Sequence, residues 1–419
     1  MGAKHLQQLR RKGWRYWLRV AAVLALGLYI GHELGQQRVW IRWRYALHQW
    51  MSSHGARAIE PAFTAVVLIG DEEYWHGELA GRTPIRRDYL ARLVTALTEA
   101  EARVIAIDFD LRAMNPDGPG QDHSLYRAET DEFIRVVTRA ATRRDVVLSK
   151  AVYSRDGRYV RQPDVYDEAG LCPPKIGPSE SDDRKKRHGV SCGYIALPYD
   201  LRLVPGPLEL PTGEILDSLA LAAVRATGRI VRGVKPGGTV GYGSHIPEAT
   251  FRERGLLVAA RDLLADPANQ PQLAGKVVIV GGAWSRFAYQ RGPRVDTYPS
   301  PTGPMPGSLL HANFIEALMD NRVYAPVPEL LLKVVELVLL ALGALMFALE
   351  LPMWRTIGAV VLACVALLLF NYFAIQNLGR FVDILVPLVF LVLHTGVDQI
   401  LDWRREALRF ARARAKEER

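Results

Sequence analysis

Polar side chains that could do chemistry lie at or just past the ends of predicted buried strands: Asp71, Asp108, Asp110 and Ser285. His311 and Asn313 fall in the predicted first turn of a helix over residues 308–321. In open parallel sheets, ligands bind beyond the carboxyl ends of the strands, so these side chains could meet in one cleft. They could equally be helix caps and hydrogen bonds that order loops.

No motif for a known catalytic or nucleotide-binding site is present. Asp108, Ser285 and His311 have the side chains of a hydrolase triad, but nothing in their spacing supports one. The two glycine-bearing loops at 241–244 and 280–282 lack the further residues of a phosphate cradle. We therefore expect a protein that is not an enzyme, with no cofactor, no metal site and no catalytic residue.

The elements that would position these side chains alternate between strands and helices. Short β-branched runs predict strands over 64–70, 103–109, 145–149, 192–197 and 276–281. Apolar residues at helical spacing predict helices over 87–101, 129–143, 215–226 and 308–321. The strand–helix–strand unit at 64–109 predicts a parallel pair with a crossover. The fold class is α/β with a mainly parallel central sheet, and with irregular insertions at about 111–128 and 154–190.

Four apolar segments flank this region, one before it and three after it. Residues 330–350, 356–375 and 381–401 are each long enough to cross about 30 Å of hydrocarbon as a helix. Residues 18–37 form a weaker run that contains Arg19, and we interpret it as an uncleaved anchor rather than a signal peptide. The chain is thus predicted to have four transmembrane α-helices, one N-terminal and three C-terminal.

The positive charge of the chain lies in its two tails. Residues 1–19 carry six basic side chains and no acidic one, and residues 402–419 carry seven basic and four acidic ones. Together they account for the whole formal net charge of +9, which removes the main support for a nucleic-acid partner. Basic residues beside membrane segments mark the cytoplasmic side. The tails 1–17 and 402–419 are therefore predicted to be cytoplasmic, and residues 38–327 to form an extracytoplasmic domain.

Two of the three cysteines, Cys172 and Cys192, fall in the predicted outside domain. In an oxidising compartment they would form a disulfide that closes a loop of about 20 residues, which contributes roughly 3 kcal/mol. Zinc binding by this pair is less favoured because the spacing is not of the Cys-x-x-Cys type. The third, Cys364, lies inside an apolar run.

Three segments of the chain resemble a CHASE2 domain. Residues 66–111 contain a strand ending in Asp71, a turn with Pro84 and an arginine at Arg86 or Arg87, a helix, and a second strand ending in Asp108. The likeness continues at 273–286, LAGKVVIVGGAWSR, and at 301–322, where the helix start reads His–Ala–Asn. It covers residues from about 40 to 401, more loosely over 150–210.

The resemblance implies an extracytoplasmic sensory module of a bacterial receptor, followed by three transmembrane helices and a cytoplasmic output. The chain continues for 18 residues past the last apolar run, so we expect a stand-alone form that acts through a separate membrane or cytoplasmic output protein. Its location would be the bacterial inner membrane, in contact with the lipid bilayer, with both termini cytoplasmic. The predicted ligand-binding residues are Asp71, Arg86, Arg87, Asp108, Ser285, His311 and Asn313.

Other functions remain open at this point. The outside domain could be an envelope scaffold that binds another protein, or the chain could be a membrane-associated hydrolase. A small-molecule ligand and a homo-oligomer are further partner candidates. The basic tail 402–419 could contact anionic lipid or dock a cytoplasmic partner.

Overall fold

The computed structural model describes residues 38–53, 59–111, 123–155, 158–161, 163–172, 189–198, 201–231, 234–242, 245–288, 294–324 and 353–378, with isolated residues elsewhere. The chain divides into two compact units, each described here by itself. One comprises residues 57–326, and the other comprises residues 1–56 together with 327–419. The predicted outside domain, 38–327, therefore includes a helix at its start that groups with the other unit.

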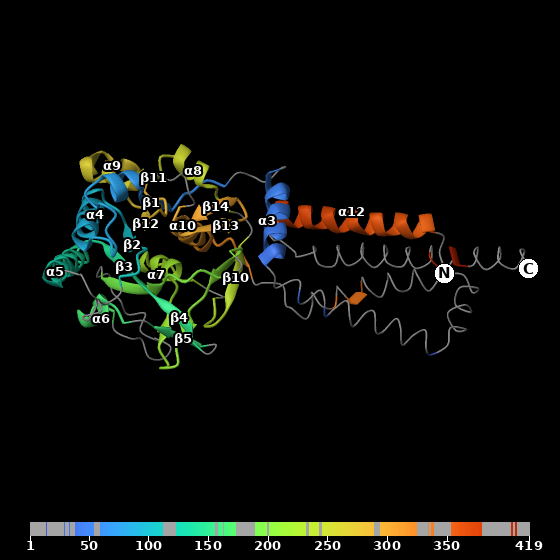
Figure 1. Ribbon diagram of the computed structural model, residues 1–419, viewed down its shortest axis with the longest axis horizontal. Helices are drawn as coiled ribbons and strands as arrows, with labels where there is room; N and C mark the ends of the chain where they lie inside the picture. Colours follow the sequence, from blue (N-terminus) through green and yellow to red (C-terminus); the bar gives the residue numbers. More distant parts are fainter. Residues whose placement is uncertain are drawn as a thin grey trace, which may run out of the picture. The chain divides into compact units, whose positions relative to one another are not determined.

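A six-stranded parallel sheet forms the centre of the 57–326 unit (Figure 1). In spatial order its strands are β11 (Leu257–Ala259), β1 (Thr64–Ile69), β12 (Val277–Gly282), β2 (Val104–Ile107), β3 (Asp145–Lys150) and β6 (Val190–Tyr194). The prediction of an α/β fold with a mainly parallel sheet is confirmed. Strands β1 and β2 are parallel, as predicted, but they are not paired, because β12 lies between them.

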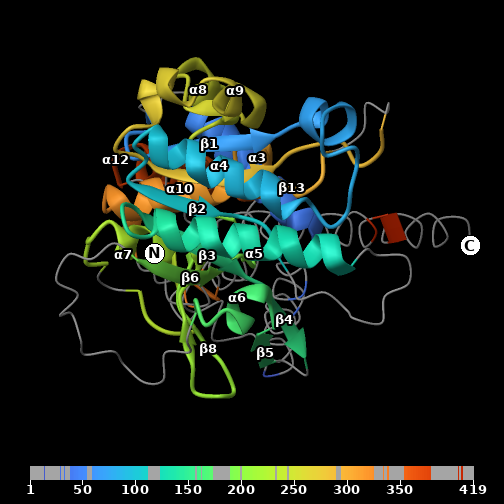
Figure 2. The ribbon, with the colours of Figure 1, turned by 90° about the vertical axis from the view of Figure 1, so that its left-hand side faces the viewer.

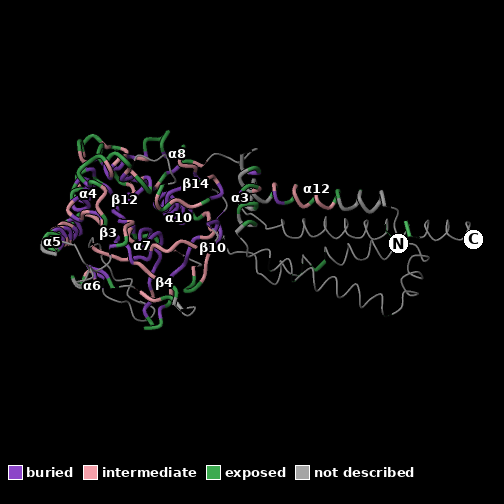
Figure 3. Tube along the Cα trace, viewed as in Figure 1, coloured by how far each residue is buried: buried purple, intermediate pink, exposed green. Residues whose placement is uncertain are grey.

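The sequences of the central strands explain why they lie in the middle of the sheet. Strands β1, β2 and β12 read TAVVLI, VIAI and VVIVGG, and every residue in them is buried (Figure 3). Continuous apolar, β-branched runs are typical of parallel strands that are covered on both faces. The sheet is therefore the core of this unit.

Helices cover both faces of the sheet (Figures 1 and 2). Helices α4 (Arg87–Glu99), α5 (His123–Ala140) and α9 (Ala260–Ala265) pack together on one side. Helices α7 (Leu219–Ala226) and α10 (Gly307–Met319) pack against each other and against the sheet on the opposite side. The unit is a three-layer α/β/α domain.

Several predicted boundaries are wrong for local reasons. Helix α5 begins at His123, six residues before the predicted start. Helix α7 begins at Leu219, because Ser218 caps it and because residues 215–216 form strand β9 (Ile215–Leu216) instead. Helix α10 begins directly after Pro306, whose backbone is extended, with a ψ of 147°. Proline has no N–H to donate within a helix, so it favours a position at the helix start. His311 and Asn313 therefore lie in its second turn, not in its first.

The remaining described elements of this unit are short and lie in loops and insertions. They are η1 (Glu72–His76), β4 (Val152–Arg155), β5 (Arg158–Arg161), α6 (Val165–Glu168), β7 (Leu203–Pro205), β8 (Leu208–Glu209), β10 (Thr239–Tyr242), α8 (Glu248–Glu253), η2 (Pro267–Asn269), η3 (Pro271–Leu273), β13 (Thr297–Ser300), β14 (Gly303–Pro306) and β15 (Val323–Tyr324). The insertion expected to be irregular at 154–190 thus contains β5 and α6. Strands β13 and β14 form a hairpin directly before α10.

A buried carboxylate ties helix α10 to the beginning of the sheet. Glu316 accepts hydrogen bonds from the backbone N–H groups of Ala62, Phe63 and Thr64, at 2.7 to 3.1 Å, and from the Thr64 hydroxyl at 2.7 Å. Glu316 is only 1% exposed. Four donors on one carboxylate compensate for its burial, so the last helix of the unit is fixed to the start of β1.

The other unit contains two described helices, α3 (Arg38–Ser53) and α12 (Met353–Leu378). Met51 of α3 is fully buried and packs with Leu47, Leu368 and Tyr372. Helix α12 contains the predicted segment 356–375. Within the described residues, the structure has no helix that is long and apolar enough to span a membrane. The predicted segments 18–37, 330–350 and 381–401 lie outside the described residues, apart from isolated positions.

Candidate functional site

The three central strands bring most of the predicted site residues to one edge of the sheet. Strands β1, β12 and β2 are adjacent and parallel, so their carboxyl ends lie side by side. Asp108 directly follows β2, while Asp71 and Ser285 follow β1 and β12 after one and two intervening residues. Helix α10 packs against β1 and β12 and brings His311 to the same region.

Asp108 and His311 form the buried centre of this region. The Nε2 atom of His311 lies 3.9 Å from Oδ1 of Asp108, which is too long for a hydrogen bond. The side chains are 1% and 5% exposed for His311 and Asp108, respectively. Among the described residues, neither Oδ2 of Asp108 nor Nδ1 of His311 has a hydrogen-bond partner. Buried polar atoms without partners are rare and costly, so this pair calls for a functional explanation.

Ser308 adds a third such side chain, which the sequence did not reveal. A Cβ atom on Gly281 would lie 2.5 Å from Cβ of Ser308, so only glycine lets α10 approach β12 this closely. The same Cβ position lies 2.7 Å from Oγ of Ser308 and 3.6 Å from Oδ2 of Asp108. The Ser308 hydroxyl is buried and has no hydrogen-bond partner within the described part of the chain. Ser308 and Asp108 therefore meet over the backbone of Gly281.

Asp296 forms the rim of the cluster. It precedes β13, has a positive φ of 52°, and accepts the Gly307 N–H at 2.9 Å through its backbone carbonyl. A Cβ atom on Gly307 would lie 2.3 Å from its Oδ2, so the carboxylate lies against the start of α10. Asp296 is itself exposed, unlike its neighbours in the cluster. We call Asp108, Asp296, Ser308 and His311 the inner cluster, and it reaches solvent at Asp296.

The electrostatics of the inner cluster favour uncharged side chains in its interior. Burial raises the pKa of Asp108 to about 7. The Asp296 carboxylate lies against the start of α10 although the residue as a whole is exposed, and the desolvation of this carboxylate raises its pKa to about 6, with a further contribution from the charge of Asp108 and an opposing hydrogen bond with Tyr298. Burial lowers the pKa of His311 to about 4, although the charge of Asp296 opposes this. Near neutral pH the imidazole is therefore neutral, while Asp108 exchanges a proton in this range.

Asp71 and Ser285 lie at the same edge but form a separate pair. The carboxylate of Asp71 accepts the backbone N–H of Ser285 at 2.6 Å and its hydroxyl at 2.8 Å. The indole N–H of Trp75 donates to the Ser285 carbonyl at 2.9 Å. Ser285 thus donates its hydroxyl to Asp71 and not to His311, so the triad considered from the sequence does not form. These bonds fasten the loop after β12 to the loop after β1.

The two predicted site arginines lie elsewhere, in the packing of α4. Arg86 forms an ion pair with Asp88. Arg87 is fully buried, lies over the ring of Tyr126 at 4.1 Å, and donates to the Tyr126 and Thr130 hydroxyls of α5. The structure does not bring either arginine into the inner cluster, and their described contacts stabilise the α4–α5 layer.

Asn313 also has structural contacts. Its side-chain oxygen accepts the Ile246 N–H at 2.6 Å, and its amide nitrogen donates to the Ile246 carbonyl at 3.2 Å and to the Leu309 carbonyl at 3.0 Å. The two bonds with Ile246 attach the loop before α8 to the middle of α10, and the bond to Leu309 lies within α10 itself. Asn313 therefore supports the helix that carries Ser308 and His311, and does not face them through any of these bonds.

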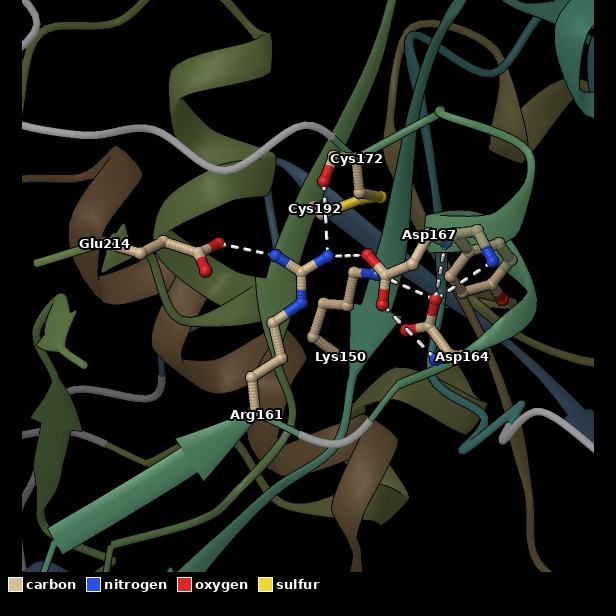
Figure 4. Close-up of a disulfide and its surroundings, with 8 residues drawn as sticks. Lys150, Arg161, Asp164, Asp167, Cys172, Cys192 and Glu214 are labelled. Atoms are coloured by element: carbon tan, nitrogen blue, oxygen red, sulfur yellow. Dashed lines mark hydrogen bonds and ion pairs between the residues drawn. A yellow bond between two sulfur atoms is a disulfide. The ribbon is translucent and has the colours of Figure 1, made fainter. Parts of the chain in front are cut away.

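A second group of charged residues lies near the edge of the sheet, beside the disulfide (Figure 4). Cys172 and Cys192 are joined as predicted, with their Cα atoms 5.9 Å apart. Lys150 of β3 is fully buried and pairs with Asp164 at 2.7 Å and Asp167 at 2.8 Å. Arg161 pairs with Asp167, with Glu214 at 2.6 Å, and with the Cys172 carbonyl at 3.2 Å. We call Lys150, Arg161, Asp164, Asp167 and Glu214 the edge cluster.

The described residues contain no group of three or more His, Cys, Asp or Glu side chains that could hold a metal ion. The inner cluster instead offers a carboxyl group, a neutral imidazole and a hydroxyl within one packed region. Such groups can bind and release a proton or exchange hydrogen bonds with a small polar ligand.

A family comparison covers the whole of this unit. The model of the CHASE2 domain matches residues 20–349 of the chain. The chain belongs to the CHASE2 family. CHASE2 is a family of sensory extracytoplasmic domains, and the match includes the whole 57–326 unit with both clusters. No curated protein and no solved structure matches the chain.

Proposed function

We propose that this chain is a membrane-anchored CHASE2 sensor that receives an envelope signal at the inner cluster and acts through a separate partner protein. The observation that carries the proposal is that three of the buried polar atoms without partners among the described residues belong to one cluster of side chains: Asp108 Oδ2, Ser308 Oγ and His311 Nδ1. Each such atom costs the fold about 1–3 kcal/mol. A cost of this size at the carboxyl edge of a parallel sheet is typical of a binding site rather than of a packed core.

Helix α10 is the element that would pass the signal on. It carries Ser308 and His311 near its beginning and Glu316 near its end, where Glu316 bonds the start of β1. A ligand or proton that favours one position of α10 would therefore act on β1 as well. Signalling requires that the ligand bind one arrangement more tightly than the other. After α10 the chain leads within 11 residues to the apolar segment that begins at residue 330.

Membrane attachment rests on the composition of the chain outside the folded domain. Residues 18–37, 330–350, 356–375 and 381–401 are the apolar segments, and the charge excess lies in the two terminal tails. The positive-inside rule then places both tails in the cytoplasm of a bacterial cell and the 57–326 unit outside. The basic tail 402–419 is the proposed contact for the output partner.

Reporter fusions test this topology. A reporter that is active only outside the cytoplasm should be active after Arg225 and silent after Arg419. A reporter that is active only in the cytoplasm, fused at the same two positions, is the control and should give the opposite result. The reverse pattern for the pair would reject the proposed arrangement.

Hydrogen exchange tests the role of the inner cluster. We expect the exchange of α10 amides in the full-length chain, in lipid nanodiscs, to change with pH around the titration of Asp108, near pH 7. Asp108→Asn should abolish the change, whereas Asp88→Asn, which alters a partly exposed carboxylate of α4 that is paired with Arg86, should leave it intact. A pH-independent α10, combined with no thermal shift from a panel of envelope metabolites and with cross-links only to protein neighbours, would favour an envelope scaffold instead.

A further inference from the structure

Helix α3 presents an apolar stripe to its surroundings. Val39, Trp43 and Trp50 are 55%, 63% and 55% exposed, and Ala46 between them is exposed as well. These four positions are spaced by four, three and four residues, so they line one side of a helix. A stripe of this kind, with two tryptophans, is costly in water and indicates a surface that is covered in the working protein.

The composition of α3 indicates what covers it. Its sixteen residues, RVWIRWRYALHQWMSS, contain three arginines and no acidic residue. They also contain three tryptophans and a tyrosine. Arginine combined with tryptophan in an amphipathic helix is typical of the boundary between lipid headgroups and acyl chains. A protein partner of α3 would need a groove that is both acidic and apolar. An anionic bilayer provides negatively charged headgroups for the arginines and acyl chains for the tryptophans.

The packing of α3 fixes the direction of the stripe. Met51 is fully buried and packs with Leu47 of α3 and with Leu368 and Tyr372 of α12, in the same unit. Figure 1 shows α3 running across the end of α12 rather than along it. Helix α12 itself exposes apolar side chains, among them Leu362, Leu369 and Phe373 at 70%, 62% and 60%. In the membrane attachment proposed above, in which the segment 356–375 enters the bilayer, α3 would lie parallel to the membrane surface.

The end of α12 that contacts α3 is consistent with the proposed topology. Leu368 and Tyr372 lie toward the C-terminal end of α12. In the proposed topology the segment 356–375 runs outward, so this end lies at the extracytoplasmic face. Helix α3 directly follows the segment 18–37, which also runs outward. Two independent parts of the sequence thus place α3 at the same membrane surface.

We propose that α3 is an interfacial helix that lies in the extracytoplasmic headgroup layer of an anionic bilayer, with Val39, Trp43, Ala46 and Trp50 toward the acyl chains. The inference rests on the proposed membrane attachment but adds a surface that this attachment does not require. Through Met51 the helix keeps its contact with α12 of the same unit, and the proposal makes this unit sensitive to the charge of the lipid.

Spin-label accessibility tests the proposal in the full-length chain. Trp43→Cys and Trp50→Cys are each labelled in a Cys364→Ser background, with the disulfide of Cys172 and Cys192 kept intact. The protein is reconstituted in vesicles of phosphatidylcholine and phosphatidylglycerol. We expect both labels to collide several-fold more with oxygen than with a water-soluble nickel chelate. A label at Glu72→Cys, whose native side chain is 67% exposed in the other unit, is the aqueous control and should show the opposite preference.

Three outcomes would overturn the inference, and they differ from one another. If the chain floats with the vesicles but the α3 labels meet the nickel chelate as freely as the control does, α3 is not interfacial and the membrane anchor stands. A second copy of the chain would cover the stripe if the labels are shielded from both reagents and their spectra show broadening by spin–spin interaction between chains. A chain that does not float with the vesicles would reject the proposed membrane attachment as well.

The contribution of lipid charge is tested with one further pair of variants. Arg42 is exposed on α3, and Arg135 is exposed on α5. Arg42→Gln should weaken the dependence of the Trp50 label's nickel accessibility on the phosphatidylglycerol content. Arg135→Gln should leave that dependence unchanged, because it lies in the other unit. An equal response of the two variants would contradict a role for anionic lipid at α3.

Discussion

The inner cluster and the edge cluster both gather ionisable side chains that are largely buried, yet they are built in opposite ways. In the edge cluster each side chain has an oppositely charged partner, at 2.8 Å or less. In the inner cluster Nε2 of the neutral His311 imidazole lies 3.9 Å from Oδ1 of Asp108, too far for a hydrogen bond. Buried charges that are paired hold a structure together, whereas buried groups left without partners are available for binding. The comparison separates a structural site from a candidate sensory one.

Breaking the edge cluster should have the largest effect. Lys150→Met leaves the buried Asp164 without its charged partner and Asp167 with Arg161 alone, and we expect the domain to lose about 3–5 kcal/mol of unfolding free energy. Burial lowers the pKa of Lys150 to about 8 even though Asp164 opposes this, so desolvation already outweighs the attraction. Urea unfolding followed by hydrogen exchange would measure the loss. The control, Arg135→Ala, removes an exposed pair with Glu132 and should cost about 0.5 kcal/mol or less.

Removing the disulfide should have the next largest effect. Replacing both Cys172 and Cys192 by serine frees a loop of sequence separation 20 and should cost about 3 kcal/mol. Arg161 also donates to the Cys172 carbonyl. Loss of the disulfide should therefore increase the mobility of the edge cluster and leave the inner cluster unchanged. Thermal midpoints in the presence and absence of a dithiol reductant would show this, and the serine variant should no longer respond to the reductant.

The inner cluster should respond to pH in the direction set by Asp108. Its pKa is raised in the fold, so its stabilising contribution is complete below the unfolded value of 3.8 and is lost as pH rises through about 7. His311 acts in the opposite sense, because its pKa is lowered to about 4. Asp108→Asn should raise stability by more at about pH 8 than at about pH 5, and the difference should be on the order of 2 to 3 kcal/mol. A variant that is less stable than the wild type at about pH 8 would contradict an unpaired Asp108.

The smallest expected effect is the difference in stability between alanine variants of two buried serines, Ser308 and Ser218. Ser308→Ala removes a hydroxyl with no hydrogen-bond partner in the described part of the chain, so it should be neutral or slightly stabilising. Ser218 caps α7, accepting the Leu221 N–H at 3.3 Å and donating to the Pro205 carbonyl at 2.8 Å. Ser218→Ala should cost about 1 kcal/mol. Similar thermal midpoints for the two variants would mean that Ser308 is bonded after all.

The central sheet and part of the inner cluster could be predicted because they depend on local pattern. Apolar runs located β1, β2 and β12, and the rule on strand ends then singled out Asp108. The position of β12 between β1 and β2 could not be predicted, since it depends on a pairing between strands more than 150 residues apart. The same limit applies to the paired edge cluster, whose members meet only in the fold.

The residues that sequence analysis missed or misplaced depend on tertiary packing. Ser308 joins the inner cluster because Gly281 lets α10 touch β12, and Asp296 joins it through the turn before β13. A serine three residues before His311 on one helix was the available signal for Ser308. Arg87 and Asn313 have the side chains of binding residues, but packing against α5 and bonds to Ile246 use their donors and acceptors.

The bonds of Glu316 have a mechanical consequence. They clamp residues 62–64, where the chain enters the sheet, to the helix from which it leaves the domain. The segments that enter and leave this unit are therefore mechanically coupled, so a displacement of one is transmitted to the other. A rotation of α10 would be transmitted to the start of β1, and it would therefore move both connecting segments together. Glu316→Gln, which weakens the clamp while keeping its shape, would uncouple them.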